Sequence, residues 1–383
     1  MLSASFICWP QRTEAHYGVG MQVYLRPIAL ADSPQSEEGE AIRLAGGLTY
    51  ASRFALIGRE GGKVVARRRF GVAQAEAVLA DAPAEARAQW DALRARRPAL
   101  ECGARTIRLD QPQVMGILNL TPDSFSDGGR FAANPDTALA HGAAMLEAGA
   151  AIIDIGGEST RPGAPPVWEG DEIARVVPVV EKLARTGAAI SVDTRRLGVM
   201  EEAQAVGAHL WNDVSALRHD PRSLEWAARS GLPVALMHAP GQGDDLHDDG
   251  IYRDVVLDVF DWLKTRRDAA EAADIARGRI LLDPGIGFGK SLNENLALMN
   301  ALPLFHALGC ALLVGASRKR MIGALAQEAP ADKRLGGSLA LALRMMEAGA
   351  QVIRVHDVPE TVQALRVWRG LRDQALTDFS QYA

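Results

Sequence analysis

From residue 113 onward, short apolar runs alternate with longer segments whose apolar residues recur at helical spacing. Several of the longer segments end at glycine, a common signal for the end of a helix. They predict helices at 135–148, 168–186, 197–207, 221–230, 251–277 and 331–348. Apolar runs of strand length occupy 114–120, 151–157, 188–194, 208–214, 233–239, 280–286, 311–317 and 351–357.

Eight strands that alternate with helices predict βαβ units, and therefore a parallel sheet. Over about 270 residues they match a closed α/β fold, the (β/α)8 TIM barrel, whose usual size is about 250 residues. An open doubly wound sheet is the second alternative, because such sheets generally have fewer strands. We therefore assign residues 111–383 to the barrel.

The first 110 residues do not share this alternation. Residues 21–30 are typical of a strand, and residues 73–96 form an Ala/Arg/Glu-rich helical stretch. We predict that residues 21–110 are a small α+β extension of unknown role. Residues 1–20 are expected to be disordered or to precede the true start. The basic run Arg67–Arg69 is expected to be a solvated face, and contact with an anion is the less favoured alternative.

Composition narrows the function classes. The chain has 383 residues, 48% of them hydrophobic and 23% charged, which is ordinary for a globular protein. A net charge of −5 argues against a general nucleic-acid binder, so local cations must hold any anionic substrate. Cys8, Cys102 and Cys310 form no C-x-x-C pair, which argues against a zinc site and favours a reducing compartment. No apolar run is long enough to span a membrane, so we expect a cytoplasmic protein.

Each predicted barrel strand runs into a polar residue at its C-terminal end. One such residue is often only the N-cap of the next helix. Eight strands that share the pattern indicate an active site, because barrel enzymes build their sites on this face. The polar residues are Asn119, Asp154, Asp193, Asn212, Asp213, His238, Asp283, Ser317, Arg354 and His356.

Basic side chains are expected to meet on the same rim. Arg161 follows the second strand, and Arg318 and Lys319 follow the seventh. Arg354 and His356 belong to the eighth strand. Because the arginine fork matches phosphate oxygens, this arrangement predicts a site for a multiply charged anion.

The glycine-rich segment 283–291 ends in Gly-Lys-Ser and partly matches a P-loop. The first glycine of that motif would fall on Pro284, so we reject a P-loop. The glycines are expected to let the backbone pass close to a planar ligand. Phe288 is expected either to fill the core or to contact an aromatic substrate.

Two long polar loops, 121–131 and 156–170, follow the first two strands. Both contain glycine or proline hinges, and long loops on the active rim tend to act as lids. A flexible surface loop is the alternative.

Seven segments keep a fixed order along the barrel: MGILNLTPDSFSDGG (115–129), DIGGESTRPGA (154–164), SVDTRR (191–196), NDVSAL (212–217), DPGIGFGK (283–290), GASRKRMIG (315–323) and RVHD (354–357). Together they resemble the dihydropteroate synthase family, over residues 113 to about 375. The resemblance implies a transferase of folate biosynthesis. Such an enzyme condenses 6-hydroxymethyl-7,8-dihydropterin diphosphate with p-aminobenzoate, releases pyrophosphate and uses Mg2+. A homodimer is the family expectation.

The resemblance also implies residue roles. The catalytic residues would be Asp193, Asp283, Lys319, Arg354 and His356. The substrate-binding residues would be Thr160, Arg161, Pro162, Asp193, Asn212, Met237, Asp283, Phe288, Ser317, Lys319, Arg354 and His356. Asn119 would be the metal ligand, and Asp154 would brace an arginine such as Arg318.

Two alternatives remain open. A pterin-barrel methyltransferase that uses methyltetrahydrofolate would share the carboxylate pocket but would have no use for the cations that suit a diphosphate. A non-catalytic paralogue would usually lose anion-binding or loop residues, which are present here. Under the favoured interpretation, Arg354→Ala is predicted to weaken diphosphate binding and to leave the fold intact.

Overall fold

The computed structural model describes residues 20–31, 39–121, 135–159, 161, 163–241, 246–248 and 250–375. The predictions for residues 1–19, for Thr160 and Pro162, and for much of the loop 121–131 lie outside the described residues. Among the helices described, none combines the length and the apolar character needed to cross a bilayer.

The predicted barrel is confirmed. Its eight parallel strands follow one another around a closed sheet, and β14 pairs with β7 to complete the circle. Each strand lies at a position predicted from the apolar runs. The strands are β7 (Gln113–Asn119), β8 (Ile152–Gly156), β9 (Ile190–Asp193), β10 (Leu210–Asp213), β11 (Val234–Met237), β12 (Ile280–Asp283), β13 (Ala311–Val314) and β14 (Val352–Val355).

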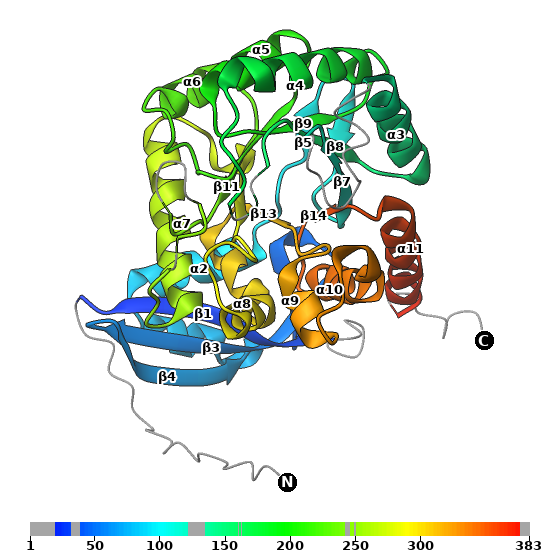
Figure 1. Ribbon diagram of the computed structural model, residues 1–383. Helices are drawn as coiled ribbons and strands as arrows, with labels where there is room; N and C mark the ends of the chain where they lie inside the picture. Colours follow the sequence, from blue (N-terminus) through cyan, green and yellow to red (C-terminus); the bar gives the residue numbers. More distant parts are fainter. Residues whose placement is uncertain are drawn as a thin grey trace.

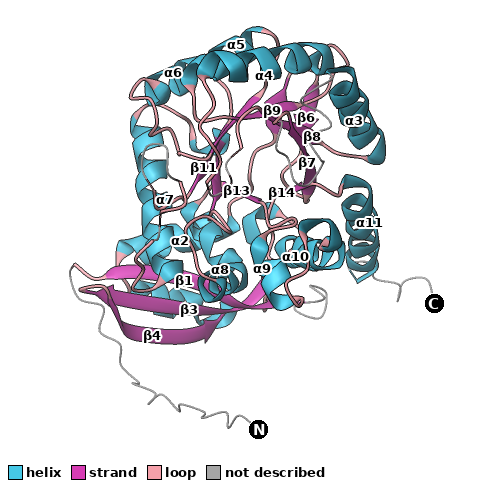
Figure 2. Ribbon diagram, in the orientation of Figure 1, coloured by secondary structure: helices cyan, strands magenta, loops and turns pink. Residues whose placement is uncertain are grey.

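Helices form a ring around these strands (Figures 1 and 2). All six predicted helices are present, and the ring also contains α8, which begins at the capping box of Ser291 and Glu294. The helices of the barrel are α3 (Pro135–Ala148), α4 (Glu169–Ala184), α5 (Leu197–Ala205), α6 (Ser223–Ser230), α7 (Val255–Ala272), α8 (Leu292–Phe305), α9 (Arg320–Leu325), α10 (Leu335–Glu347) and α11 (Val358–Ala375).

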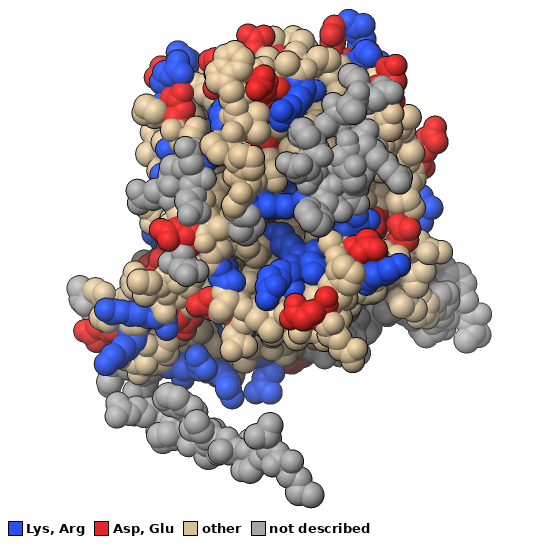
Figure 3. All heavy atoms as spheres, in the orientation of Figure 1, with Lys and Arg blue, Asp and Glu red and all other residues tan. Residues whose placement is uncertain are grey.

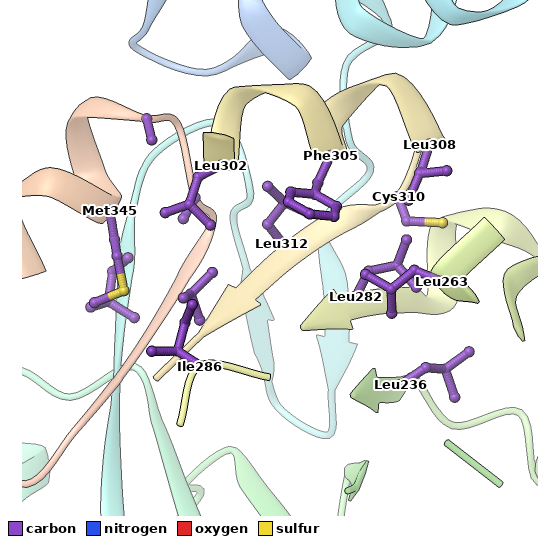
Figure 4. Close-up of a cluster of buried hydrophobic side chains, with 14 of the residues drawn as sticks. Leu236, Leu263, Leu282, Ile286, Leu302, Phe305, Leu308, Cys310, Leu312 and Met345 are labelled. Atoms are coloured by element: carbon purple, nitrogen blue, oxygen red, sulfur yellow. The ribbon is translucent and has the colours of Figure 1, made fainter. Parts of the chain in front are cut away.

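Apolar side chains hold the helices against the strands (Figure 4). Leu282 and Leu312 come from barrel strands, and Leu302 and Phe305 come from α8. All four are fully buried in one continuous core. Because burial of apolar area contributes about 25 cal/mol per Å², this layer is a main source of the barrel's stability and keeps the strand ends in fixed positions.

A hairpin of β5 (Leu100–Cys102) and β6 (Arg105–Ile107) closes the N-terminal end of the barrel. Its buried residues Leu100 and Ile107 pack with Met115 and Leu281, which lie on barrel strands. The hairpin therefore packs as part of the barrel, which in terms of packing begins near residue 100. The predicted boundary at residue 111 would instead assign the hairpin to the extension.

The remaining extension is a four-stranded antiparallel sheet with two helices. The strand predicted at 21–30 is β1, whereas the long strands β3 and β4 were not predicted. The helical stretch 73–96 is broken at Pro83 into two helices. The elements are β1 (Gln22–Ala31), β2 (Ile42–Arg43), β3 (Tyr50–Glu60), β4 (Lys63–Gly71), α1 (Ala75–Ala80) and α2 (Ala84–Arg94).

The extension is attached to the barrel through polar contacts with α7 and α8. The Tyr24 hydroxyl donates to Asp261 at 2.7 Å, and Arg59 forms a salt bridge of 3.3 Å with the same carboxylate. Arg97 is 3% exposed and donates to the carbonyls of Cys310 and His306, at 3.0 and 2.9 Å. These contacts fix the sheet against the outside of the barrel.

Candidate active site

A pocket lies at the C-terminal ends of the barrel strands, where the sequence predicts it. Figure 3 shows Lys and Arg side chains gathered in the middle of this face. The pocket brings together most of the predicted site residues with three that were not predicted, Ile117, Val214 and Gly315. Its lining consists of Ile117, Asp193, Asn212, Val214, Met237, Asp283, Phe288, Gly315, Ser317, Lys319, Arg354 and His356.

Arg354 of β14 is held between two carboxylates. Its Nε donates to Asp154 Oδ2 at 2.6 Å, and its Nη2 donates to Asp193 Oδ2 at 2.7 Å. Asn212 Nδ2 also donates to Asp154 Oδ2, at 3.1 Å. The expectation that Asp154 braces an arginine is confirmed, but that arginine is Arg354 and not Arg318. The carboxylate of Asp154 instead orients Arg354 and Asn212, two of the residues that line the pocket.

Arg318 is directed away from this network. Its backbone has a φ of 58°, in the left-handed region that non-glycine residues rarely adopt. Its guanidinium pairs with Asp357, with Nε to Oδ2 at 3.2 Å, at the start of α11. Because of this backbone conformation, the two consecutive side chains point in different directions. Lys319 enters the pocket, whereas Arg318 binds Asp357 at the start of α11.

Two buried aspartates face this group of cations. Burial raises the pKa of Asp193, and the positive charge of Arg354 opposes the rise. Burial likewise raises the pKa of Asp283, and the positive charge of Lys319 opposes this rise. Asp283 Oδ1 accepts a hydrogen bond of 2.7 Å from the backbone of Gly285, which fixes the carboxylate at the end of β12. These carboxylates are placed to bind the polar edge of a ligand or to stabilise positive charge on it.

Lys319 and Phe288 form one wall of the pocket. The ammonium group lies 4.6 Å from the ring centroid of Phe288, a cation–π distance, and donates to the carbonyl of Ile286. Phe288 is also part of a small apolar cluster with Met237 and Val214. The sequence left open whether Phe288 fills the core or faces a substrate. In the structure it packs in this apolar cluster and also lines the pocket.

His356 lies among positive charges. Burial, followed by the charges of Arg318, Arg354, Arg161 and Lys319, lowers its pKa well below the usual value. The imidazole is therefore neutral, and its Nδ1 lies 3.0 Å from Ser317 Oγ. His356 can supply hydrogen bonds, whereas the arginines and Lys319 supply charge. The charge of Arg161 acts on His356, so this residue of the loop after β8 lies on the side of the pocket formed by His356.

The glycine-rich segment is shaped by its protein neighbours. A Cβ at Gly285, whose φ is 68°, would lie 1.9 Å from the carbonyl oxygen of His238. Glycine is thus required for contact with the loop after β11, and the predicted approach to a planar ligand is not the reason at this position. Lys290 Nζ donates to the carbonyls of Gly285 and Phe288, at 2.8 and 2.9 Å. This lysine holds the segment together, in agreement with the rejection of a P-loop.

Asn119 ends β7, where its Oδ1 lies next to Gly156 of β8. Within the described part of the chain, no cluster of three His, Cys, Asp or Glu side chains could hold a metal ion. An amide oxygen can nonetheless be the single protein ligand of Mg2+, which keeps several waters and binds mainly to substrate phosphates. The residues present fit Mg2+ only in that form.

The three comparisons with known proteins agree with this geometry. A family model described as pterin binding enzyme matches residues 115–356. The dihydropteroate synthase of Neisseria meningitidis serogroup B is 49% identical over 280 residues, which is 72% of this chain and 98% of that protein. The Escherichia coli K12 dihydropteroate synthase is 49% identical over 263 residues, 68% of this chain and 92% of that protein.

Solved structures give the same result. A crystal structure of Yersinia pestis dihydropteroate synthase with a sulfonamide drug complex has a TM-score of 0.68 and 48% identity, over 72% of this chain and 99% of that one. The Xanthomonas albilineans dihydropteroate synthase with 4-aminobenzoic acid has a TM-score of 0.67 and 47% identity, over 73% of this chain and 100% of that one. With its closed barrel and its pocket of carboxylates and cations, the chain belongs to the dihydropteroate synthase family of pterin-binding enzymes.

Proposed function

We propose that this protein catalyses the folate-pathway condensation of 6-hydroxymethyl-7,8-dihydropterin diphosphate with p-aminobenzoate, giving 7,8-dihydropteroate and pyrophosphate. The observation that carries the proposal is the convergence of Asp193, Asp283, Lys319 and Arg354 in one pocket at the C-terminal ends of the strands. A relative from Burkholderia cenocepacia, 40% identical, is complexed with 7,8-dihydropteroate.

The buried carboxylates and amide bind the pterin in this proposal. A pterin edge is rich in N–H donors, and Asp193, Asp283 and Asn212 present acceptors on three different strands. Buried polar groups that need a partner discriminate strongly against ligands that lack one. The apolar side chains of Met237 and Val214 cover the adjacent wall.

The reaction breaks the bond between the pterin methylene carbon and the diphosphate oxygen, and the diphosphate leaves with the electron pair. Positive charge develops on the pterin, where Asp193 and Asp283 stabilise it. Arg354 and the neutral His356 bind the departing oxygens. The amine nitrogen of p-aminobenzoate then forms a bond with the carbon and loses a proton. Because no covalent enzyme intermediate is needed, the pocket requires no nucleophilic Ser or Cys.

Mg2+ is part of the proposal, with Asn119 as its protein ligand. When bound to the diphosphate, the ion supplies further stabilisation of negative charge on the leaving group. We also propose a homodimer in the cytoplasm. Free, buried Cys102 and Cys310 support a reducing compartment, and sedimentation would measure the oligomeric state.

A pyrophosphate-release assay tests the proposed function. The full chain with pterin diphosphate and Mg2+ is expected to release pyrophosphate when p-aminobenzoate is present, and EDTA is expected to stop the release. Folded protein that binds pterin but releases no pyrophosphate would indicate a non-catalytic paralogue. Methyl transfer from methyltetrahydrofolate would instead favour the methyltransferase alternative.

We predict that deprotonation of Lys319 sets the alkaline limit of activity. Burial lowers the pKa of this lysine to about 8, although Asp283 opposes the shift. The ammonium form is present below this pKa, so kcat/KM is expected to fall about tenfold per pH unit above pH 8. Lys319→Arg keeps its charge and should remove this fall. An unchanged alkaline limb in that variant, measured by the same assay, would show that another group titrates.

A further inference from the structure

The outer sheet of the extension carries a second group of cations, far from the barrel pocket in sequence and with no lining residue in common with it. Arg26 of β1, Arg53 of β3 and Arg67 and Arg69 of β4 surround a cavity of about 400 Å³. Figure 3 shows basic side chains along the lower edge of the molecule, where Figure 1 draws β3 and β4.

Strand pairing explains why these arginines converge. In the register of the sheet, Arg26 and Arg69 both pair with Ala55, so that a small residue separates two guanidinium groups. In the next row, Arg67 pairs with Ile57. Directly paired residues lie on the same face of an antiparallel sheet, so these side chains share one face.

The central residue of the basic run behaves differently. Arg68 pairs with Leu56 and points to the opposite face, where it lies 3.8 Å from Asp81. Within the described part of the chain, no carboxylate lines the cavity. Among the described residues, the side chains of Arg53, Arg67 and Arg69 have no hydrogen-bond or ion-pair partner, and that of Arg26 donates to the carbonyl of Asn300.

The arrangement is electrostatically unfavourable by itself. Burial lowers the pKa of Arg26, and the charge of Arg67 lowers it further. Asp254 opposes this shift, and Arg344 adds a smaller lowering effect. Like charges close together on one face of a sheet are destabilising. Protection of an exposed sheet edge could account for the arginines of the edge strand β4, but not for Arg53 on the central strand β3.

The floor of the cavity is apolar. Ala55 and Ile57 are each 3% exposed beneath the arginines, and Ile28 and Ala29 form the side toward β1. A concave apolar floor with a few convergent charged groups is typical of small-ligand sites, whose volumes start near 300 Å³. An extended polyanion such as nucleic acid is generally bound by a stripe or groove, and the overall charge of −5 does not favour it.

We infer that this arginine cavity binds a small molecule that carries two or more phosphate groups. Four guanidinium forks, which no carboxylate of the described residues neutralises in the cavity, match the charge and the oxygen geometry of a di- or triphosphate. The apolar floor suits the uncharged part of such a molecule. The inference is independent of the proposed function, because it uses no residue of the barrel pocket.

Titration calorimetry of the full chain with tripolyphosphate tests the inference. Arg67→Ala/Arg69→Ala is expected to weaken binding at the cavity about 100-fold, because two charge-assisted contacts are lost. Arg68→Ala is the control, since it removes an arginine from the same strand but on the opposite face, and it should leave the affinity within about twofold. Any binding at the barrel pocket is fitted as a separate site, which these substitutions do not touch.

Results of three kinds would overturn the inference. In the first, the double variant binds tripolyphosphate as the wild type does. In the second, Arg68→Ala weakens binding as much as the double variant, or citrate binds as tightly as tripolyphosphate, so that only charge matters. In the third, anionic vesicles bind in an Arg67- and Arg69-dependent manner while tripolyphosphate does not, which would make the face a membrane contact. Pyrophosphate release by the barrel is expected to be equal in all three proteins, so failure of either site is seen separately.

Discussion

Asp283→Asn is expected to lower kcat/KM about 1000-fold with little loss of stability. Removal of a single preorganised electrostatic partner of a transition state costs about 10²–10³ in rate. Asp283 faces Lys319 and Arg354 in the pocket, where its negative charge can stabilise the pterin cation. The asparagine keeps an oxygen that can accept the hydrogen bond from Gly285, so the end of β12 retains its shape.

Asp213→Asn is the matched control for this prediction. Asp213 is fully buried at the end of β10, but it does not line the pocket. Its carboxylate accepts hydrogen bonds of 2.7 Å from the backbone of Ser215 and of Leu217, which hold the following turn. This control should lower the melting temperature and leave kcat/KM within about tenfold. Equal losses of activity in the two variants would mean that Asp283 has only a structural role.

The barrel could be predicted from the sequence because its signal is local. Parallel strands buried on both faces are continuous apolar runs, and β8 to β14 fall on such runs. The extension carries a weaker signal. β4 consists mostly of exposed residues, among them Arg67, Arg68 and Arg69, and its helix-compatible composition hides its pairing with β3. β4 can therefore be recognised as a strand only from its pairing with β3 in the structure.

The pocket was predictable as a set of residues but not as a set of contacts. Strand ends meet on one face of any barrel, so Asp193, Asp283 and Arg354 could be brought together without coordinates. Which arginine pairs with Asp154 depends on barrel closure, since β8 and β14 both flank β7 while their residues are 200 positions apart. The left-handed backbone of Arg318, which redirects its side chain to Asp357, has no sequence signal.

Arg354→Ala is expected to abolish measurable activity and also to destabilise the protein by about 3–5 kcal/mol, as happens when one partner of a buried ion pair is removed. The second effect changes the expectation from the sequence that the fold would remain intact. Arg354 is paired with both Asp154 and Asp193, which are 0% and 9% exposed. Without the guanidinium, burial of these carboxylates is no longer opposed, and they lose their main hydrogen-bond donor.

The pH dependence of stability distinguishes this cause from a simple cavity. Loss of Arg354 should raise the folded-state pKa of Asp193 further above its unfolded value, because the opposing charge is gone. The native state then binds protons that the unfolded state does not, so the free energy of unfolding of the variant falls as pH rises. Denaturant unfolding at pH 5 and pH 8 should therefore show a smaller difference from wild type at pH 5. A pH-independent difference would point to lost packing.

A second substitution separates the structural role of Arg354 from its part in catalysis. Asp154 contacts Arg354 and Asn212 but does not line the pocket. In Arg354→Ala/Asp154→Asn, one buried charge is removed together with its partner, so part of the stability lost in Arg354→Ala should return. Activity should not return, because no guanidinium is left to bind the diphosphate. Recovery of kcat/KM together with stability would show that Arg354 acts only by holding the two carboxylates. Recovery of stability alone would place its charge in the reaction.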